Sequence, residues 1–79
     1  MNRISEKIGD AFYAKKDGFG LAFFINDFVE VVEGANLGKE GFVVALEALE
    51  PEQKYLVEFV NGKESVFLST SLKRKESVT

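Results

Sequence analysis

Carboxylates and hydroxyls are the side chains of this sequence that could take part in chemistry, because its 79 residues include no cysteine and no histidine. Without these two residue types the chain has no thiolate nucleophile, no disulfide and no imidazole proton shuttle. Glu47, Glu50 and Glu52 could bind a cation or transfer protons, but their spacing around a turn favours a solvated acidic loop. The hydroxyls of residues 69–71 lack a base to activate them and are typical of a turn. The sequence therefore predicts no enzyme, no metal site and no cofactor.

Charge is unevenly distributed along the chain, whose formal net charge is −3 at neutral pH. Residues 1–26 carry +1 and residues 65–79 carry +2, whereas residues 27–64 hold nine carboxylates and three lysines, for −6. Nucleic-acid binding takes its affinity from basic side chains that displace counterions from phosphates. The acidic centre therefore argues against a nucleic-acid partner and favours a protein partner or a second copy of the chain.

No stretch of the sequence is apolar for long enough to cross a membrane as a helix. The longest candidate, residues 19–25, is far shorter than the roughly 20 residues that a membrane span needs. Residues 1–10 mix basic and acidic side chains and lack the apolar region of a secretory signal. We therefore expect a cytoplasmic protein without a membrane segment.

Residues 3–16 are predicted to form an amphipathic helix, because apolar residues recur there at helical spacing. Asn2 is the expected N-cap and Gly18 the expected stop. An irregular arm that becomes ordered on a partner is the alternative for this segment. The apolar stripe of the predicted helix consists of Ile4, Ile8 and Phe12.

From residue 19 onward the apolar residues recur with a period of two, and glycine and asparagine separate the runs, which indicates β-structure. The predicted strands are residues 21–25, 28–32, 42–47, 54–60 and 64–69, with a short sixth strand at residues 72–75. Several short strands in a segment of about 60 residues are typical of a small β-barrel.

Two turns are predicted in the second half of the chain. Asn61-Gly62 indicates a type I′ hairpin, because both central residues of that turn need a positive φ. This hairpin would pair residues 57–60 with residues 63–66. Pro51 has a restricted φ and no N–H, so it predicts an exposed loop around its own position.

Alternating valines and spaced glycines mark the middle of the chain. Val29 and Val31 point to the same side of a predicted strand, and Val43 continues the alternation after a glycine-containing loop. Glycines in such a loop are expected where the backbone takes a positive φ or passes close to another strand. With the preceding aspartate, the pattern consists of Asp27, Val29, Val31, Gly34, Gly38, Gly41 and Val43.

This pattern resembles the KOW motif of SH3-like barrels, which occurs in a ribosomal large-subunit protein and in bacterial transcription-elongation factors. The resemblance implies an SH3-like fold. Relatives that grip RNA carry basic residues through the loop, whereas here Lys39 stands nearly alone among carboxylates, which argues against RNA binding. The second half of the chain resembles, more loosely, acidic SH3-like domains that dock on larger assemblies and small bacterial immunity proteins.

Apolar residues fall on both faces of the predicted central strands, which is unexpected for strands with one wet face. Phe23, Phe24 and Phe28 could form an exposed aromatic platform, although the core is the usual place for such residues. A second patch could be covered by the helix stripe or by a partner, and we expect the helix of the same chain to cover it. This patch consists of Phe42, Val44, Leu56 and Val60; with Phe23, Phe24 and Lys39 these are the candidate partner-binding residues.

The sequence therefore predicts a helix or arm at residues 1–18, an SH3-like five-stranded barrel at residues 19–75, and a frayed tail at residues 76–79. The expected function is that of a non-catalytic interaction domain that binds another protein. A KOW-type module that contacts RNA or a polymerase is the first alternative, and an immunity-type inhibitor protein is the second. The predicted structural glycines are Gly34, Gly38, Gly41 and Gly62.

Overall fold

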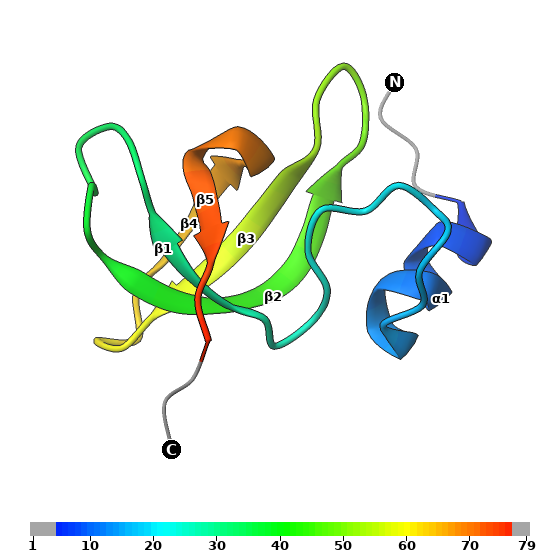
Figure 1. The fold of residues 1–79 in the computed structure, drawn as a ribbon, viewed down its shortest axis with the longest axis horizontal. Helices are drawn as coiled ribbons and strands as arrows, with labels where there is room; N and C mark the ends of the chain where they lie inside the picture. Colours follow the sequence, from blue (N-terminus) through cyan, green and yellow to red (C-terminus); the bar gives the residue numbers. More distant parts are fainter. Residues whose placement is uncertain (1–4, 77–79) are drawn as a thin grey trace.

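The computed structural model describes residues 5–76. In chain order its elements are the helix α1 (Glu6–Ala14), the strands β1 (Phe28–Val31), β2 (Glu40–Ala48), β3 (Lys54–Phe59) and β4 (Glu64–Leu68), the short 3-10 helix η1 (Ser69–Ser71), and β5 (Leu72–Arg74). Figure 1 shows a strongly curved sheet with α1 beside one end of it. Neither helix of the described residues is long and apolar enough to cross a membrane.

The helix α1 begins later than the sequence predicted and is shorter. Ser5 is its N-cap, because the Ser5 hydroxyl accepts a hydrogen bond from the N–H of Ile8 at 3.3 Å. Lys15 ends the helix in a left-handed conformation, with φ 57°, so the expected stop at Gly18 is wrong. The expected N-cap Asn2 and the stripe residue Ile4 lie outside the described residues.

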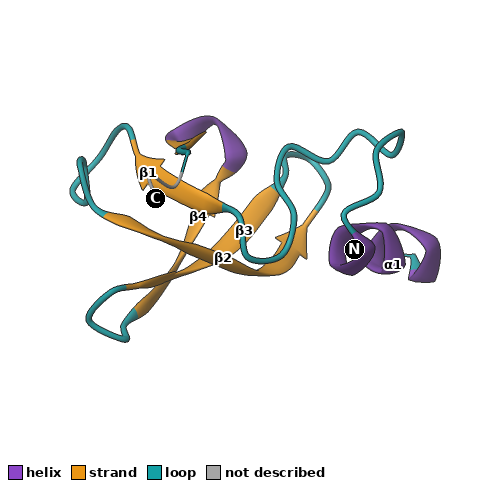
Figure 2. Cartoon of the chain, turned by 60° about the horizontal axis from the view of Figure 1, so that its bottom comes forward, coloured by secondary structure: helices purple, strands orange, loops and turns teal. Residues whose placement is uncertain are grey.

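Five antiparallel strands form one sheet in the order β4-β3-β2-β1-β5. The first four strands follow one another as neighbours, and the chain then returns through η1 to place β5 beside β1. The prediction of a mainly β domain with five strands and an N-terminal helix is confirmed, although the sheet is not closed into a barrel. Figure 2 shows the strong bend of the long strand β2, with α1 beyond the end of the sheet.

The predicted strand at residues 21–25 is wrong, because this segment is an irregular connection between α1 and β1. Its backbone is held by side chains instead of by a neighbouring strand. The carboxylate of Asp27 accepts the N–H of Phe24 at 2.8 Å and also pairs with Arg74 of β5 at 2.9 Å. Asp27, the first residue of the KOW-like pattern, therefore joins the connection to the last strand.

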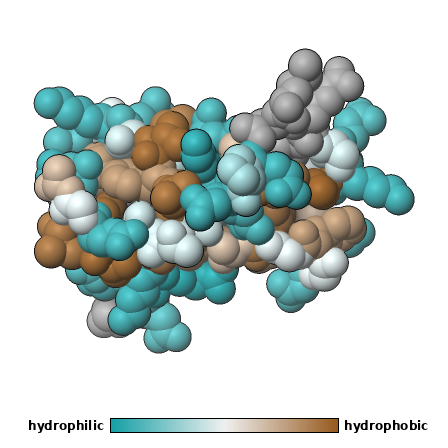
Figure 3. Space-filling model, turned by 90° about the horizontal axis from the view of Figure 1, so that it is seen from above, coloured by the Kyte–Doolittle hydropathy of each residue, from teal (hydrophilic) through white to brown (hydrophobic). Residues whose placement is uncertain are grey.

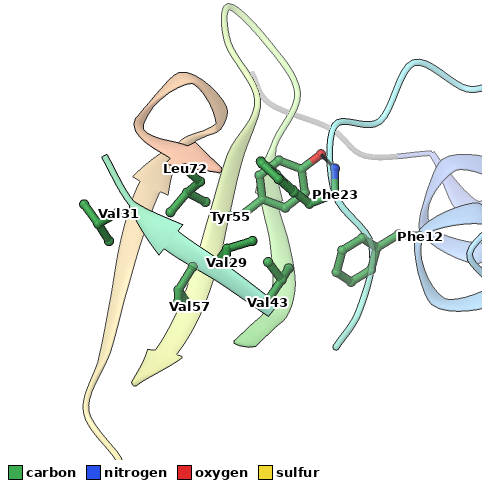
Figure 4. Packing of buried hydrophobic residues seen from close by; sticks show 8 residues of the cluster. All are labelled: Phe12, Phe23, Val29, Val31, Val43, Tyr55, Val57 and Leu72. Atoms are coloured by element: carbon green, nitrogen blue, oxygen red, sulfur yellow. Dashed lines mark hydrogen bonds between the residues drawn. The ribbon is translucent and has the colours of Figure 1, made fainter. Parts of the chain in front are cut away.

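The core lies on the concave face of the sheet, and residues from α1 and from the connection complete it (Figure 4). Phe12 of α1 and Phe23 of the connection both approach Tyr55 of β3, with ring centroids 6.2 and 5.4 Å from that of Tyr55. The buried cluster consists of Phe12, Phe23, Val29, Val31, Val43, Tyr55, Val57 and Leu72. Every strand except the edge strand β4 contributes at least one of these side chains.

The hydroxyl of Tyr55 fastens the connection to the sheet. Tyr55 is fully buried, and its hydroxyl oxygen accepts the backbone N–H groups of Ala22 at 3.1 Å and of Phe23 at 3.3 Å. The same hydroxyl donates to the side-chain oxygen of Gln53 at 2.6 Å. Burial raises the pKa of Tyr55 and the carboxylate of Asp27 raises it further, while the two backbone donors lower it in part.

The β3–β4 hairpin does not have the predicted two-residue turn. Phe59 donates its N–H to Lys63 at 2.8 Å and accepts the N–H of Gly62 at 2.9 Å, so residues 60–62 form the loop. Gly62 has φ 86°, but Asn61 does not have a positive φ, which excludes type I′ and fits a turn closed by a left-handed glycine. The strands therefore pair with Glu58 opposite Glu64, one residue away from the expected register. A shift of one residue moves every β4 side chain to the other face of the sheet.

The glycines of the KOW-like pattern have two different roles. Gly34 and Gly38 adopt positive φ values of 87° and 89° in the β1–β2 loop. Gly41 does not have a positive φ, so of the two roles expected for these glycines it has the second, a close approach to another strand. It lies where β2 passes against β3, and a Cβ at Gly41 would collide with the Glu58 carbonyl and lie 2.9 Å from a methyl carbon of Val57.

We expect Gly41→Ala to lower the free energy of unfolding by more than about 1 kcal/mol, because its methyl group would press on the backbone of β3. Gly9→Ala is the control, since Gly9 lies within α1 with open space around its Cα, and alanine should raise the stability by up to about 1 kcal/mol. Urea denaturation of both variants measures the two effects. Equal stability of Gly41→Ala and the wild type would contradict the close approach of β2 and β3.

We expect Tyr55→Phe to lower the free energy of unfolding by about 1–3 kcal/mol, because the buried N–H of Phe23 loses its acceptor and the N–H of Ala22 keeps only the side-chain oxygen of Gln53. The pKa of Tyr55 is raised above 10.0 in the folded protein, so the Tyr55 hydroxyl loses its proton at a lower pH in the unfolded chain than in the folded one. The free energy of unfolding of the wild type therefore falls as the pH rises above 10.0. The stability difference between wild type and Tyr55→Phe should therefore narrow at high pH. Urea denaturation at about pH 8 and about pH 11 measures it. A difference that does not change with pH would show that Tyr55 ionises equally in both states.

Candidate protein-interaction surface

The face of the sheet opposite the core, called here the outer face, carries an apolar strip across four strands. Phe28 of β1 pairs with Phe42 of β2, and their ring centroids are 5.0 Å apart. Leu56 of β3 pairs with Val66 of β4 and is a diagonal neighbour of Phe42. Phe42 and Val66 are each 48% exposed. The apolar strip, which consists of Phe28, Phe42, Leu56 and Val66, therefore remains open to solvent.

The helix does not cover this strip, so the expectation that α1 packs over it is wrong. Phe12 and Ala11 are the buried residues of α1, and Phe12 belongs to the core cluster on the opposite side of the sheet. Figure 1 shows α1 beside one end of the sheet and away from the middle of its strands. The reason is that Tyr55 and Phe23 leave an aromatic site at the end of the core, which Phe12 fills.

Carboxylates lie beside the apolar strip. Glu58 pairs with Phe42 on one side and with Glu64 on the other, so two like charges face each other across β3 and β4. Both side chains are exposed, and within residues 5–76 neither takes part in an ion pair. Like charges directly opposite each other destabilise a sheet. This pair therefore leaves negative charge next to exposed aromatic surface without a stabilising role in the fold.

A second acidic pair on the outer face is already neutralised in part. Glu30 of β1 lies opposite Glu40 of β2, and the ammonium group of Lys75 contacts Glu40 directly and Glu30 at 3.9 Å. The hydrogen bond to Glu40 raises the pKa of Lys75. Uncompensated negative charge is therefore concentrated at the β3–β4 end of the outer face.

Several candidate residues lie elsewhere. Phe23 is buried in the core, so its assignment to a partner-binding platform is wrong. Phe24 is half-buried in the connection before β1. Val44 is half-buried at a register shift between Val43 and Ala45, where β2 carries an extra residue relative to β3. Of the predicted patch, the structure places Phe42 and Leu56 on the apolar strip.

Val60 and Lys39 lie together at a separate place. Val60 is 89% exposed in the β3–β4 hairpin, and with Lys39, Glu40 and Phe59 it borders an open hollow of about 250 Å³. The Lys39 ammonium lies 5.7 Å from the centroid of the Phe59 ring. Lys39 therefore covers an aromatic ring of the same chain, and the structure does not join this pair to the apolar strip.

The end of the molecule shown from above in Figure 3 carries hydrophobic side chains interrupted by hydrophilic ones. Two hollows open around η1 and the loops beside it. One, of about 270 Å³, is bordered by the β2–β3 loop, including Pro51 and Gln53. The other, of about 470 Å³, lies between the β1–β2 loop and the end of β4, including Val66 and Leu68. The second hollow is bordered by β4, whose Val66 belongs to the apolar strip.

Sequence reasoning named Phe28 as part of a possible aromatic platform but favoured the core for it, and it missed Val66 and the facing carboxylates Glu58 and Glu64. The outward position of Phe28 could have been found, because Val29 and Val31 point inward and the intervening positions must point outward. Val66 could not be placed, because its face depends on the one-residue register of the β3–β4 hairpin. The carboxylate pair depends on the same register.

No model of a protein family matches the chain, and no curated protein matches it significantly. Among residues 5–76, no three His, Cys, Asp or Glu side chains come close enough together to hold a metal ion. The chemical character of the outer face therefore comes from its exposed apolar strip and from Glu58 and Glu64, which form no ion pair with any described residue.

We expect Glu58→Lys to raise the free energy of unfolding by about 0.3–1 kcal/mol in low salt, because it replaces a repulsive cross-strand pair by an attractive one. The gain should shrink in about 1 M salt, where exposed charges are screened. Glu52→Lys is the matched control, since it changes net charge equally but lies in the β2–β3 loop. Urea denaturation at both salt concentrations measures the effect. A loss of stability in Glu58→Lys would mean that this carboxylate has a structural partner.

Proposed function

We propose that this chain is a non-catalytic interaction domain with the fold of an SH3-like barrel that is left open between β4 and β5, and that it binds another protein through the outer face of its sheet. The β1–β4 meander, followed by a 3-10 helix and by β5 beside β1, supports an SH3-like fold. The observation that carries the function is the half-exposed apolar strip, which the helix of the same chain leaves open. Exposed apolar surface bordered by polar residues is typical of a binding face.

Charge favours a protein over a nucleic acid as the partner. Glu58 and Glu64 lie directly beside the apolar strip, and a phosphate backbone would be repelled there. An RNA-contacting or polymerase-contacting KOW-type role is therefore the weaker proposal, and RNA is an outcome that the experiment below can detect. An immunity-type inhibitor would be one special case of the protein-binding role.

A substitution in the apolar strip tests this function. We expect Phe42→Ser to abolish capture of the partner from an extract of the source cells by the immobilised domain, with at least about tenfold less retained, because a central aromatic contact is lost. Leu37→Ser is the matched control, since Leu37 is exposed in the β1–β2 loop and away from the strip. Thermal unfolding of both variants verifies that they are folded.

The retained material is analysed by mass spectrometry and by RNA sequencing. A protein held by wild type and by Leu37→Ser, but not by Phe42→Ser, supports the proposal. Proteins retained equally by all three chains, or a specific RNA retained in their place, would show that the outer face is not a protein-binding surface.

A further inference from the structure

The two edges of the sheet are protected to very different degrees. β5 has three residues, and the basic side chains of Lys73, Arg74 and the following Lys75 line it. β4 has five residues, no proline and no register shift against β3, and Glu64 is its one charged residue. Soluble proteins normally protect sheet edges with short strands, basic residues, proline or bulges. β5 has two of these features and β4 has none of them.

Backbone groups of β4 point away from the sheet at alternate residues. Lys63 accepts the N–H of Phe59 at one end of the strand, and Ser69 donates its N–H to Gln53 at the other. Along an antiparallel strand, every second residue is hydrogen-bonded to the neighbouring strand, so the backbone groups of Ser65 and Phe67 also point toward β3. The N–H groups of the other β4 residues therefore face the free edge, as do their C=O groups except that of Leu68, which accepts the first hydrogen bond of η1. These residues are Glu64, Val66 and Leu68.

The same residues place their side chains on the outer face. Val66 pairs with Leu56 of the apolar strip, and Glu64 pairs with Glu58. The hollow of about 470 Å³ beside Val66 and Leu68 leaves room next to the edge, toward the β1–β2 loop. Free backbone groups, an exposed apolar side chain and an unpaired carboxylate thus lie along one edge.

We infer that the partner binds by adding an extended segment to β4 as a further antiparallel strand of the sheet. This inference rests on the proposed function and specifies its geometry. Backbone hydrogen bonds to Glu64, Val66 and Leu68 hold the segment, and side chains at alternate positions determine its specificity. Read from its N-terminus, the segment has apolar residues opposite Leu68 and Val66 and a lysine or arginine opposite Glu64.

A second copy of the chain fits this edge less well than a cationic segment does. Two β4 strands paired antiparallel about Val66 would place Glu64 of each copy beside Leu68 of the other. Neither Glu64 would face a cation directly, because the nearest lysine of the other copy, Lys54, lies one strand further away, opposite Leu68. Each chain also carries a net charge of −3, so two copies repel each other. Charge complementarity therefore favours a basic partner.

Synthetic peptides of about nine residues test the inference directly. The probe contains the order valine, threonine, valine, threonine, lysine, which matches the pattern expected opposite β4. One control peptide replaces the lysine by glutamate, and another has the same composition in a scrambled order. Binding to the full chain is measured by NMR titration, and amide hydrogen exchange is measured in the complex. We expect at least about tenfold slower exchange at the N–H groups of Glu64, Val66 and Leu68, because each gains a hydrogen bond.

Val66→Pro separates strand addition from simple contact with the outer face. The N–H of Val66 faces the free edge, so proline removes a donor to the added strand without removing a hydrogen bond to β3. We expect Val66→Pro to weaken peptide binding at least about tenfold, and Val66→Thr, which keeps the N–H, to weaken it less. If Val66→Pro is unfolded, a probe peptide that is N-methylated at the residue opposite Val66 replaces it, because the methyl group removes one backbone hydrogen bond between the peptide and Val66. Exchange protection in the wild type is then compared between the two peptides.

Strand addition to β4 is supported by slower exchange at the three β4 amides together with tighter binding of the lysine peptide than of the glutamate peptide. The inference is wrong if no peptide binds at about millimolar concentration, if the bound peptide protects other amides, or if the chain dimerises through β4. A natural partner that loses binding to Phe42→Ser but binds Val66→Pro fully would overturn strand addition and leave the proposed function intact. The absence of any partner sensitive to Phe42→Ser would overturn the proposed function itself.

Discussion

The hydroxyl of Tyr55 is the interaction on which the arrangement of the molecule depends. It receives two backbone N–H groups from a connection that pairs with no strand, and so holds that connection against the end of the sheet. Phe23 of this connection packs edge-to-face on the Tyr55 ring, and Phe12 of α1 belongs to the same core cluster. Burying the Tyr55 hydroxyl without hydrogen-bond partners would lower the stability of the fold. The hydrogen bonds of this hydroxyl therefore favour the one position of the connection in which they all form.

The position of the helix has a consequence for the opposite side of the sheet. Phe12 fills the end of the core, and the outer face keeps its apolar strip exposed because no other described segment packs over it. In a domain of this size few apolar side chains can be spared from the core, so an aromatic strip on the wet face is a costly feature. The facing carboxylates Glu58 and Glu64 add a second unfavourable feature at the same place. Both features are explained if the outer face binds a partner.

Several features could be predicted from the sequence because they depend on local chemistry. The period of two after residue 19, the helical spacing before it and the glycines of the β1–β2 loop indicate a small β domain with one helix. Gly34 and Gly38 are needed where φ is positive, and the alternation of Val29 and Val31 identifies the inner face of β1. The segment at residues 21–25 failed as a strand because the N–H groups of Ala22 and Phe23 donate to the side chains of Gln53 and Tyr55, more than 30 residues away in the sequence, which periodicity does not reveal.

The sequence by itself determined which residues could form strands and which could turn, since those preferences come from each residue and its neighbours. It did not determine which face each β4 residue occupies. Asn61-Gly62 suits both a type I′ turn and a longer loop that ends in a left-handed glycine, and the two differ by one residue in register. Packing decided between them, because the observed register brings Phe67 against Phe59 on the inner side, with ring centroids 5.8 Å apart. Val66 and Glu64 reach the outer face for the same reason, so tertiary packing, and not local propensity, created the candidate surface.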